Sequence, residues 1–211
     1  YTEREIFLRE LVSNASDALS KVQLTTLTEE KVLDKDAELQ IKISFDENKH
    51  KLEIEDSGCG MTKEELVSNL GTIANSGTLK FLQQAQAENK SAENLIGQFG
   101  VGFYSVFMVA ERVELTTRSW QVDSQAWEWT SSGGGQYEIT PAKYNQRGTR
   151  VTIFLKEDAK EFCSKWKLES IIKKYSNYLP FPVKVNDQTV NQVKAIWTQS
   201  KSDVEEDQYK E

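Results

Sequence analysis

Two runs of alternating residues, followed directly by a glycine-rich turn, constrain the fold of this chain more than any other feature. Apolar side chains occupy every second position from Leu39 to Phe45, and the alternation resumes at Leu52 and Ile54 after a polar turn. This spacing predicts a β-hairpin with one apolar face. The second strand ends on a carboxylate, Asp56, so the hairpin is expected to deliver an acid to the start of the next turn.

That turn, Asp-Ser-Gly-Cys-Gly-Met at 56–61, has the residue types of a purine pocket. Gly58 and Gly60 allow a sharp bend and leave room for a flat ligand against the backbone. An ionised Asp56 only accepts hydrogen bonds, which suits an exocyclic amine such as that of adenine. Met61 offers a polarizable contact for a ring face. The same pattern occurs in ordinary turns, so this segment alone leaves a plain turn open.

A polar stripe along the first predicted helix, residues 3–22, suggests a metal and water site. Glu10, Asn14, Asp17 and Lys21 follow one another at helical spacing beside an apolar arc. The amide oxygen of Asn14 suits Mg²⁺, which commonly bridges phosphate oxygens. Glu10, one turn away, is placed to orient or deprotonate a water. Asp17 and Lys21 are spaced for an i,i+4 pair, and a solvated helix face is the alternative.

A second glycine-rich segment precedes an apolar stretch, 102–110, that is expected to be helical. Free N–H groups at a helix N-terminus favour a phosphate chain. The pattern is neither a Rossmann fingerprint, because no strand directly precedes it, nor a Walker loop, because Gly-Lys-Ser/Thr is missing. Glycines that only permit close packing are the alternative. The candidate phosphate contacts are Gly97, Gln98, Gly100, Val101, Gly102 and Phe103.

The remaining patterns predict an α+β fold, a two-layer sandwich of helices on a mixed, mostly antiparallel sheet. Thr62 and Glu65 form a capping box that opens a short helix to Leu70. Residues 71–101 look like an insert with a helical piece near 78–88. Further strands are expected at 111–118, 125–131, 136–140 and 149–156, and a last hairpin at 181–185 and 189–198. A helix is expected at 158–177, with Phe162, Trp166, Leu168, Ile171 and Ile172 buried.

Composition narrows the classes of partner. The chain has 211 residues, a net charge of −7 and a sequence pI of about 5.0. The acidic balance argues against nucleic acid, which needs a basic face. No apolar run approaches the length of a membrane span, so no membrane is expected. Two distant cysteines show neither metal nor disulfide spacing and favour a reducing compartment.

Five segments together resemble the N-terminal ATPase domain of the 90-kDa heat-shock chaperones, a family of the GHKL superfamily. The match runs over essentially the whole chain, and the string at 96–105 is highly specific. The short last hairpin and the absence of a long acidic linker favour the bacterial or mitochondrial type. The segments are Arg-Glu-Leu-Val-Ser-Asn-Ala-Ser-Asp-Ala (9–18), Asp-Ser-Gly-Cys-Gly-Met (56–61), Leu-Gly-Thr-Ile-Ala (70–74), Ile-Gly-Gln-Phe-Gly-Val-Gly-Phe-Tyr-Ser (96–105) and Arg-Gly-Thr (147–149).

The resemblance implies the Bergerat ATP-binding fold, with ATP or ADP and Mg²⁺ as cofactors. By position, Glu10 matches the general base and Asn14 the Mg²⁺ ligand, with Asp17 in the same stripe assigned to the nucleotide site. Asp56 matches the acceptor of the adenine amine, and Thr149 supports adenine through a water. Gly58, Gly60 and Met61 match the base pocket, Asn69 a contact near the sugar and phosphates, and Gly100, Val101, Gly102 and Phe103 the phosphate loop.

The resemblance also sets expectations for the whole protein. It implies one nucleotide-binding domain over 1–211, with a lid at about 75–102 and a charged tail from about 199. In the family, an arginine of the following domain completes the site, so this chain alone is expected to hydrolyse ATP very slowly. Client proteins, possible cochaperones, a homodimer at full length, a monomeric fragment and a cytoplasmic location, alternatively the mitochondrial matrix, are implied.

Two positions depart from the family pattern, and two other functions remain open. Asn75 stands where a lysine is usual, and Cys59 replaces an aliphatic residue and would put a thiol near the pocket. A sensor histidine kinase of the same fold would need a phosphoacceptor histidine. The single histidine, His50, is expected to be an ordinary surface residue of a strand. A non-catalytic peptide-binding module would have no affinity for nucleotide.

Overall fold

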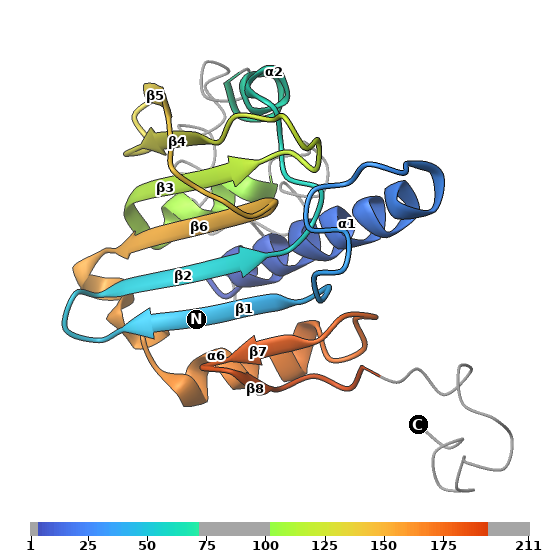
Figure 1. Cartoon of the computed structure of the whole chain (residues 1–211). Coiled ribbons are helices and arrows are strands. Elements are labelled where there is room, and N and C mark those ends of the chain that lie inside the picture. Colours follow the sequence, from blue (N-terminus) through green and yellow to red (C-terminus); the bar gives the residue numbers. More distant parts are fainter. Residues whose placement is uncertain (1–3, 72–101, 194–211) are drawn as a thin grey trace, which may run out of the picture.

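The described residues form one twisted sheet of eight strands with helices against it. The computed structural model describes residues 4–71 and 102–193 (Figure 1). The strand order is β5-β4-β3-β6-β2-β1-β7-β8, and only the β1–β7 pair in this sheet is parallel. The strands are β1 (Ile41–Asp46), β2 (Lys51–Asp56), β3 (Ala110–Arg118), β4 (Trp127–Ser131), β5 (Tyr137–Pro141), β6 (Gly148–Leu155), β7 (Val183–Val185) and β8 (Gln188–Thr189).

The helices α1 and α6 lie behind the sheet in the view of Figure 1, which confirms the predicted two-layer α+β fold. The longest helix, α1, carries the polar stripe predicted from the sequence. The capping box at Thr62 and Glu65 opens α2 as expected. The helical elements are α1 (Ile6–Thr28), α2 (Lys63–Leu66), the π-helical turn η1 (Val67–Gly71), the 3₁₀ helices η2 (Gly102–Met108) and η3 (Glu157–Phe162), and α6 (Lys165–Tyr175).

The main core lies between the helices and the inner face of the sheet. Phe7, Leu8 and Leu19 of α1 are fully buried against residues such as Leu52 and Ile153 of β2 and β6. Each large apolar side chain buried in this way contributes roughly 1.5–3 kcal/mol. The predicted alternation of the hairpin is therefore what attaches β2 to α1, and its inner face ends at Asp56.

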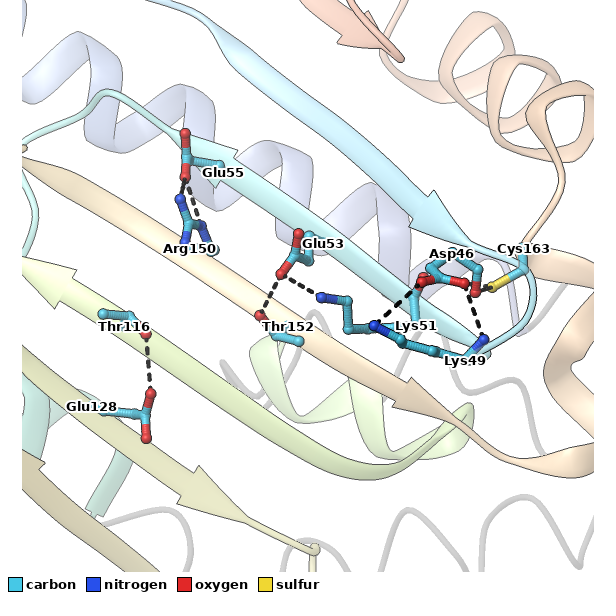
Figure 2. Close-up of polar contacts among 10 residues, drawn as sticks. All are labelled: Asp46, Lys49, Lys51, Glu53, Glu55, Thr116, Glu128, Arg150, Thr152 and Cys163. Carbon is cyan, nitrogen blue, oxygen red and sulfur yellow. Dashed lines mark hydrogen bonds and ion pairs between the residues drawn. The ribbon is translucent and has the colours of Figure 1, made fainter. Parts of the chain in front are cut away.

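The outer face of the same strands is polar. Figure 2 shows ion pairs and hydrogen bonds that join β2 to β6 and β3 to β4. Arg150 donates from Nε to Glu55 Oε2 at 2.7 Å. The Glu53 carboxylate accepts hydrogen bonds from the Lys51 ammonium at 3.0 Å and from the Thr152 hydroxyl at 3.4 Å. Thr116 likewise donates to Glu128 on β4 at 3.4 Å.

Two helix predictions are wrong in detail. The helix expected at 158–177 is interrupted, because η3 ends at Phe162 and Ser164 caps a new helix by accepting from the Lys167 N–H. The restart changes the helical phase, so Trp166 is 76 % exposed rather than buried, whereas Phe162, Leu168, Ile171 and Ile172 are buried as predicted. The stretch at 102–110 is a 3₁₀ helix that gives way to β3 at Ala110.

Other boundaries differ by smaller amounts. Helix α1 runs six residues further than the predicted end at residue 22, to Thr28. The last hairpin turns at Asn186 and Asp187, both with positive φ, but β8 ends at Thr189. The lid expected at about 75–102 lies outside the described residues except for Gly102, as do the tail from about 199 and the helical piece near 78–88. No helix in the described ranges is long and apolar enough to cross a membrane.

Candidate functional site

A cavity of about 550 Å³ opens between α1, the ends of β2 and β6, and the short helices α2, η1 and η2. Its size is that of a small-molecule pocket. Apolar side chains of Leu11, Ala15, Ile54, Leu115 and Val151 form part of its wall. Nine of the residues predicted from the sequence also line it: Glu10, Asn14, Asp56, Gly60, Met61, Asn69, Gly102, Phe103 and Thr149.

Asp56 is the buried carboxylate of this cavity. It is 7 % exposed, and among the described residues it forms no ion pair. Its Oδ1 accepts the Gly58 N–H at 2.8 Å. Burial raises the pKa of Asp56 to about 7, although the backbone N–H groups of Gly58 and Thr149 and the charge of Arg147 act in the opposite direction. Asp56 is thus a buried carboxyl that two backbone N–H groups stabilise only in part.

The turn after Asp56 needs glycine at two positions. Gly60 has φ +59°, and a Cβ there would lie 1.8 Å from the Arg118 carbonyl oxygen. A Cβ on Gly58 would lie 2.6 Å from the Cβ of Ala18 on α1. The Cys59 N–H donates to the Ala18 carbonyl at 3.1 Å, which ties the turn to the helix. Because the turn is held this closely, Met61 and Gly60 face the cavity while Gly58 supports Asp56 from outside its lining.

A pair of buried hydroxyls completes this end of the cavity. Thr149 is opposite Asp56 in the β2–β6 register, and its Oγ1 lies 3.0 Å from that of Thr117 on β3. Thr117 also accepts the Met61 N–H at 3.0 Å. The sequence analysis missed Thr117. The signal that could have identified Thr117 is its position: it continues the alternation of buried residues set by Val113 and Leu115, yet it carries a hydroxyl.

The opposite end of the cavity is formed by α1 and η2. Glu10 accepts a hydrogen bond from Arg9 (Nη2 to Oε1 3.2 Å), and both side chains are partly exposed. A Cβ on Gly102 would lie 2.3 Å from Glu10 Oε2, so a larger residue there would require the Glu10 side chain to move. Asn14 lies one turn further along α1 and is exposed at the cavity. Glu10 and Asn14 thus face the start of η2.

The other predicted residues are placed as follows. Asp17 is exposed on α1 and is not among the residues that line the cavity. Lys21 lines it and forms an ion pair with Glu65 of α2, 4.0 Å away. Asn69 donates to the sulfur of Met61 at 3.6 Å, and the Cys59 thiol, whose pKa burial raises, is part of the wall. Gly97, Gln98, Gly100, Val101 and Asn75 lie outside the described residues.

The donor set decides what kind of cation fits. Within residues 4–71 and 102–193, no group of three or more His, Cys, Asp or Glu side chains is arranged to hold a metal. Asn14 offers one neutral oxygen at the cavity. This agrees with Mg²⁺, which takes few protein oxygens and otherwise keeps phosphate oxygens and waters. It does not agree with a cation held by protein ligands alone.

The chain belongs to the family described as histidine kinase-, DNA gyrase B- and HSP90-like ATPases, whose profile matches residues 1–146. The expected resemblance to the N-terminal ATPase domain of the 90-kDa chaperones is confirmed by individual relatives. The chain is 50 % identical to the chaperone protein HtpG of Desulfitobacterium hafniense, over all of this chain and 34 % of the relative.

Two further relatives have the same name and a similar coverage. HtpG of Chlorobium phaeobacteroides is 49 % identical, and HtpG of Chlorobaculum tepidum is 46 % identical, each over the whole of this chain and 34 % of its own length. The chain therefore spans about a third of the curated relatives it matches. These relatives favour the chaperone interpretation over a sensor kinase or a peptide-binding module.

Proposed function

We propose that this chain is the ATP-binding and ATP-hydrolysing domain of a stress-response chaperone that assists protein folding. The observation that carries the proposal is the shared cavity. It brings together a buried, unpaired carboxylate at Asp56 and the side chains of Glu10 and Asn14 from α1. A base acceptor at one end and a polar helix face at the other match the two ends of a nucleotide. The relatives' name supports the chaperone role.

The cavity suggests how the nucleotide lies. The adenine amine donates to Asp56, and Thr149 meets the ring through a water. Gly60 and Met61 contact the base, with Gly58 fixing the turn behind them. Asn69 faces the sugar and phosphates, and the phosphates extend toward Gly102 and Phe103 and the preceding Gly97, Gln98, Gly100 and Val101. Asp17 stands beyond the cavity rim on α1, where contact through a water is the role that its exposure allows.

Hydrolysis would be an in-line attack of water on the γ-phosphate. Glu10 orients the water and receives its proton, because its carboxylate lies beside Gly102 of the proposed phosphate loop. Asn14 would hold Mg²⁺, which offsets charge on the phosphate oxygens when it is bound. The backbone of Gly102 approaches the Glu10 carboxylate closely. Among the described residues that line the cavity there is no arginine, so we expect the transition-state charge to be incompletely stabilised by this chain.

For the whole protein, we propose that ATP biases closure of a lid and of a homodimer and so couples nucleotide to client proteins. Cochaperones would act on that cycle. The fragment alone would be monomeric. The bacterial origin of the relatives favours the cytoplasm, with the mitochondrial matrix as the alternative. His50, in the β1–β2 turn at φ +49°, plays no part in the proposed chemistry.

A calorimetric titration with ADP and Mg²⁺ tests the proposal. We expect heat of binding and a rise in melting temperature that grows with ADP concentration. GDP is the matched control, because guanine presents an acceptor oxygen where adenine presents its amine, and it should bind far more weakly. A chain that binds neither nucleotide would support a peptide-binding module and would remove the ATPase proposal.

The isolated chain should turn over very slowly even when it binds well. Phosphate release by the 211-residue chain would be compared with that of the full-length protein at saturating ATP. Equal rates would show that no group from a following domain is needed.

A further inference from the structure

A buried arginine lies directly behind the proposed base pocket. Arg147, one residue before β6, is 1 % exposed. Its Nη1 donates to the Gly58 carbonyl at 3.3 Å, and its Nη2 to the Asp34 carbonyl at 3.2 Å. Its own N–H donates to Asp34 Oδ2 at 3.1 Å. One side chain thus joins the turn after β2 to the loop that precedes β1.

Asp56 stands between this arginine and the nucleotide cavity. A second cavity, of about 490 Å³, lies on the loop side and is lined by Arg147, Asp34, Gln40 and Asp56. Asp56 therefore lines both cavities. Gly58 connects Asp56 to Arg147, because the Gly58 N–H donates to the Asp56 carboxylate and the Gly58 carbonyl accepts a hydrogen bond from Arg147. Movement of the guanidinium would displace the donor that Asp56 depends on.

A purely structural role explains this arrangement poorly. Burying a guanidinium costs several kcal/mol unless it is well compensated. The two acceptors of the Arg147 guanidinium are neutral carbonyls, and its buried Nε has no partner among the described residues. Its charge interacts with the carboxylates of Asp34 and Asp56, and it stabilises the ionised form of Asp56.

We propose that Arg147 is a positioning residue for base recognition. It fixes the Gly58 turn so that the Gly58 N–H meets the Asp56 carboxylate, and it places a positive charge behind that carboxylate. The inference rests on the proposed nucleotide function, since a carboxylate that accepts the adenine amine must be ionised and correctly oriented.

The charges around Asp56 fix the sign of the expected effect. Burial and the neighbouring Glu55 raise the pKa of Asp56, while Arg147 and the two backbone donors lower it, with a result of about 7. Cys59 and Tyr144 also interact with this carboxyl. Removing the charge of Arg147 would therefore raise the pKa of Asp56 further. At neutral pH, Asp56 would then be protonated in a larger fraction of the molecules, and a protonated Asp56 accepts the adenine amine poorly.

The test measures ADP affinity of the 211-residue chain with Mg²⁺ between about pH 6 and about pH 9. Arg147→Gln removes the charge, and Arg147→Lys keeps it without the fork that reaches two carbonyls. Arg112→Gln is the matched control, because Arg112 pairs with Glu114 and lies over Phe154, at the far end of β6. Thermal unfolding of each variant checks that it folds.

We expect Arg147→Gln to weaken ADP binding by about tenfold or more at neutral pH and by less at high pH, with the midpoint of the pH profile moved upward. Arg147→Lys should restore the midpoint but not the full affinity, and Arg112→Gln should match the parent chain. Equal losses at every pH would reduce Arg147 to a structural role and overturn the inference.

Two further outcomes separate this inference from the proposed function. If the parent chain binds ADP and Arg147→Gln binds it equally with the same profile, only the inference fails. If the parent chain does not bind ADP, the proposed function fails and takes the inference with it. Should Arg147→Gln not unfold cooperatively, Arg147→Lys decides, and an affinity equal to that of the parent at high pH contradicts the positioning role.

Discussion

Glu55 and Asp56 are consecutive carboxylates of β2, and they meet opposite environments. Glu55 points to the outer face, where Arg150 donates to it at 2.7 Å (Figure 2). Asp56 points inward and is 7 % exposed, without an ion pair among the described residues. The outer acid is satisfied by its own chain, whereas the inner one has a pKa raised to about 7 by burial. One residue of strand alternation separates a structural carboxylate from a candidate binding group.

The difference teaches where function is worth seeking. An unpaired carboxyl in a cavity is destabilising when ionised, so a fold retains it only for a reason outside folding. A half-exposed ion pair, in contrast, contributes little to stability and does not by itself indicate a functional site. The following predictions test how far that distinction holds.

The largest effect is expected for Asp56→Asn. The amide presents a donor where the adenine amine needs an acceptor, so ADP affinity should fall by about 1,000-fold or more. Glu55→Gln, one residue away, should leave affinity within about threefold. Calorimetry on both variants measures the contrast. An Asp56→Asn chain that binds ADP normally would end the assignment of Asp56 to the base.

Glu10→Ala tests whether a partly exposed, ion-paired carboxylate can also be functional. Glu10 forms an ion pair with Arg9, just as Glu55 forms one with Arg150. If Glu10 serves the water, hydrolysis by the full-length protein should fall by about 100-fold or more. ATP binding should persist, since Glu10 is not expected to hold the nucleotide. Steady-state phosphate release and a binding titration separate the two effects. Unchanged turnover would show that Glu10, like Glu55, forms an ion pair without a role in hydrolysis.

A pH titration should distinguish the two acids of β2 without mutation. Below about pH 7, Asp56 becomes protonated and loses its role as acceptor, so ADP affinity should fall by up to about tenfold per pH unit. Adenosine, which has no phosphate to titrate, should show the same trend. An affinity independent of pH between about 6 and 8 would contradict the raised pKa.

The stability of the unliganded protein should move in the opposite direction. The folded pKa of Asp56 lies above the ordinary value of 3.8, so its protonated form favours the folded state. This contribution is fully present below about pH 4 and is lost as the pH rises through about 7.

The smallest effect is expected for Arg150→Gln. The pair with Glu55 is partly exposed, with side chains 41 % and 21 % accessible, so unfolding free energy should change by less than about 1 kcal/mol. Urea unfolding measures this change. A loss above about 2 kcal/mol would show that the outer polar network matters more than its exposure suggests.

The sequence was most informative where local rules act. Alternation predicted the hairpin that ends at Asp56, and the Thr62 capping box predicted the start of α2. Helical spacing predicted that Glu10 and Asn14 share one face of α1, and both line the cavity. The helix restart at Ser164 was missed because no glycine or proline lies between η3 and α6 to mark it. Trp166 was consequently assigned to the wrong face.

Long-range contacts carried no comparable pattern. The sequence pattern identifies Arg147 only as part of an Arg-Gly-Thr string, because its partners Gly58 and Asp34 are far away in sequence. Thr117 became meaningful only once β3 was paired with β6, which places its hydroxyl against Thr149. Such groups are defined by register and burial, and neither can be read from spacing alone.

The one parallel pair of this sheet has a consequence for synthesis. On one edge, β1 pairs along its whole length with β2, the strand made immediately after it, and on the other edge its first three residues pair with β7, with Ile41 opposite Val183. On the ribosome, the outer edge of β1 must stay uncovered until nearly the whole described chain has emerged. Since such distant pairings form slowly, the nascent domain would expose an open strand edge during translation, and an exposed edge favours aggregation.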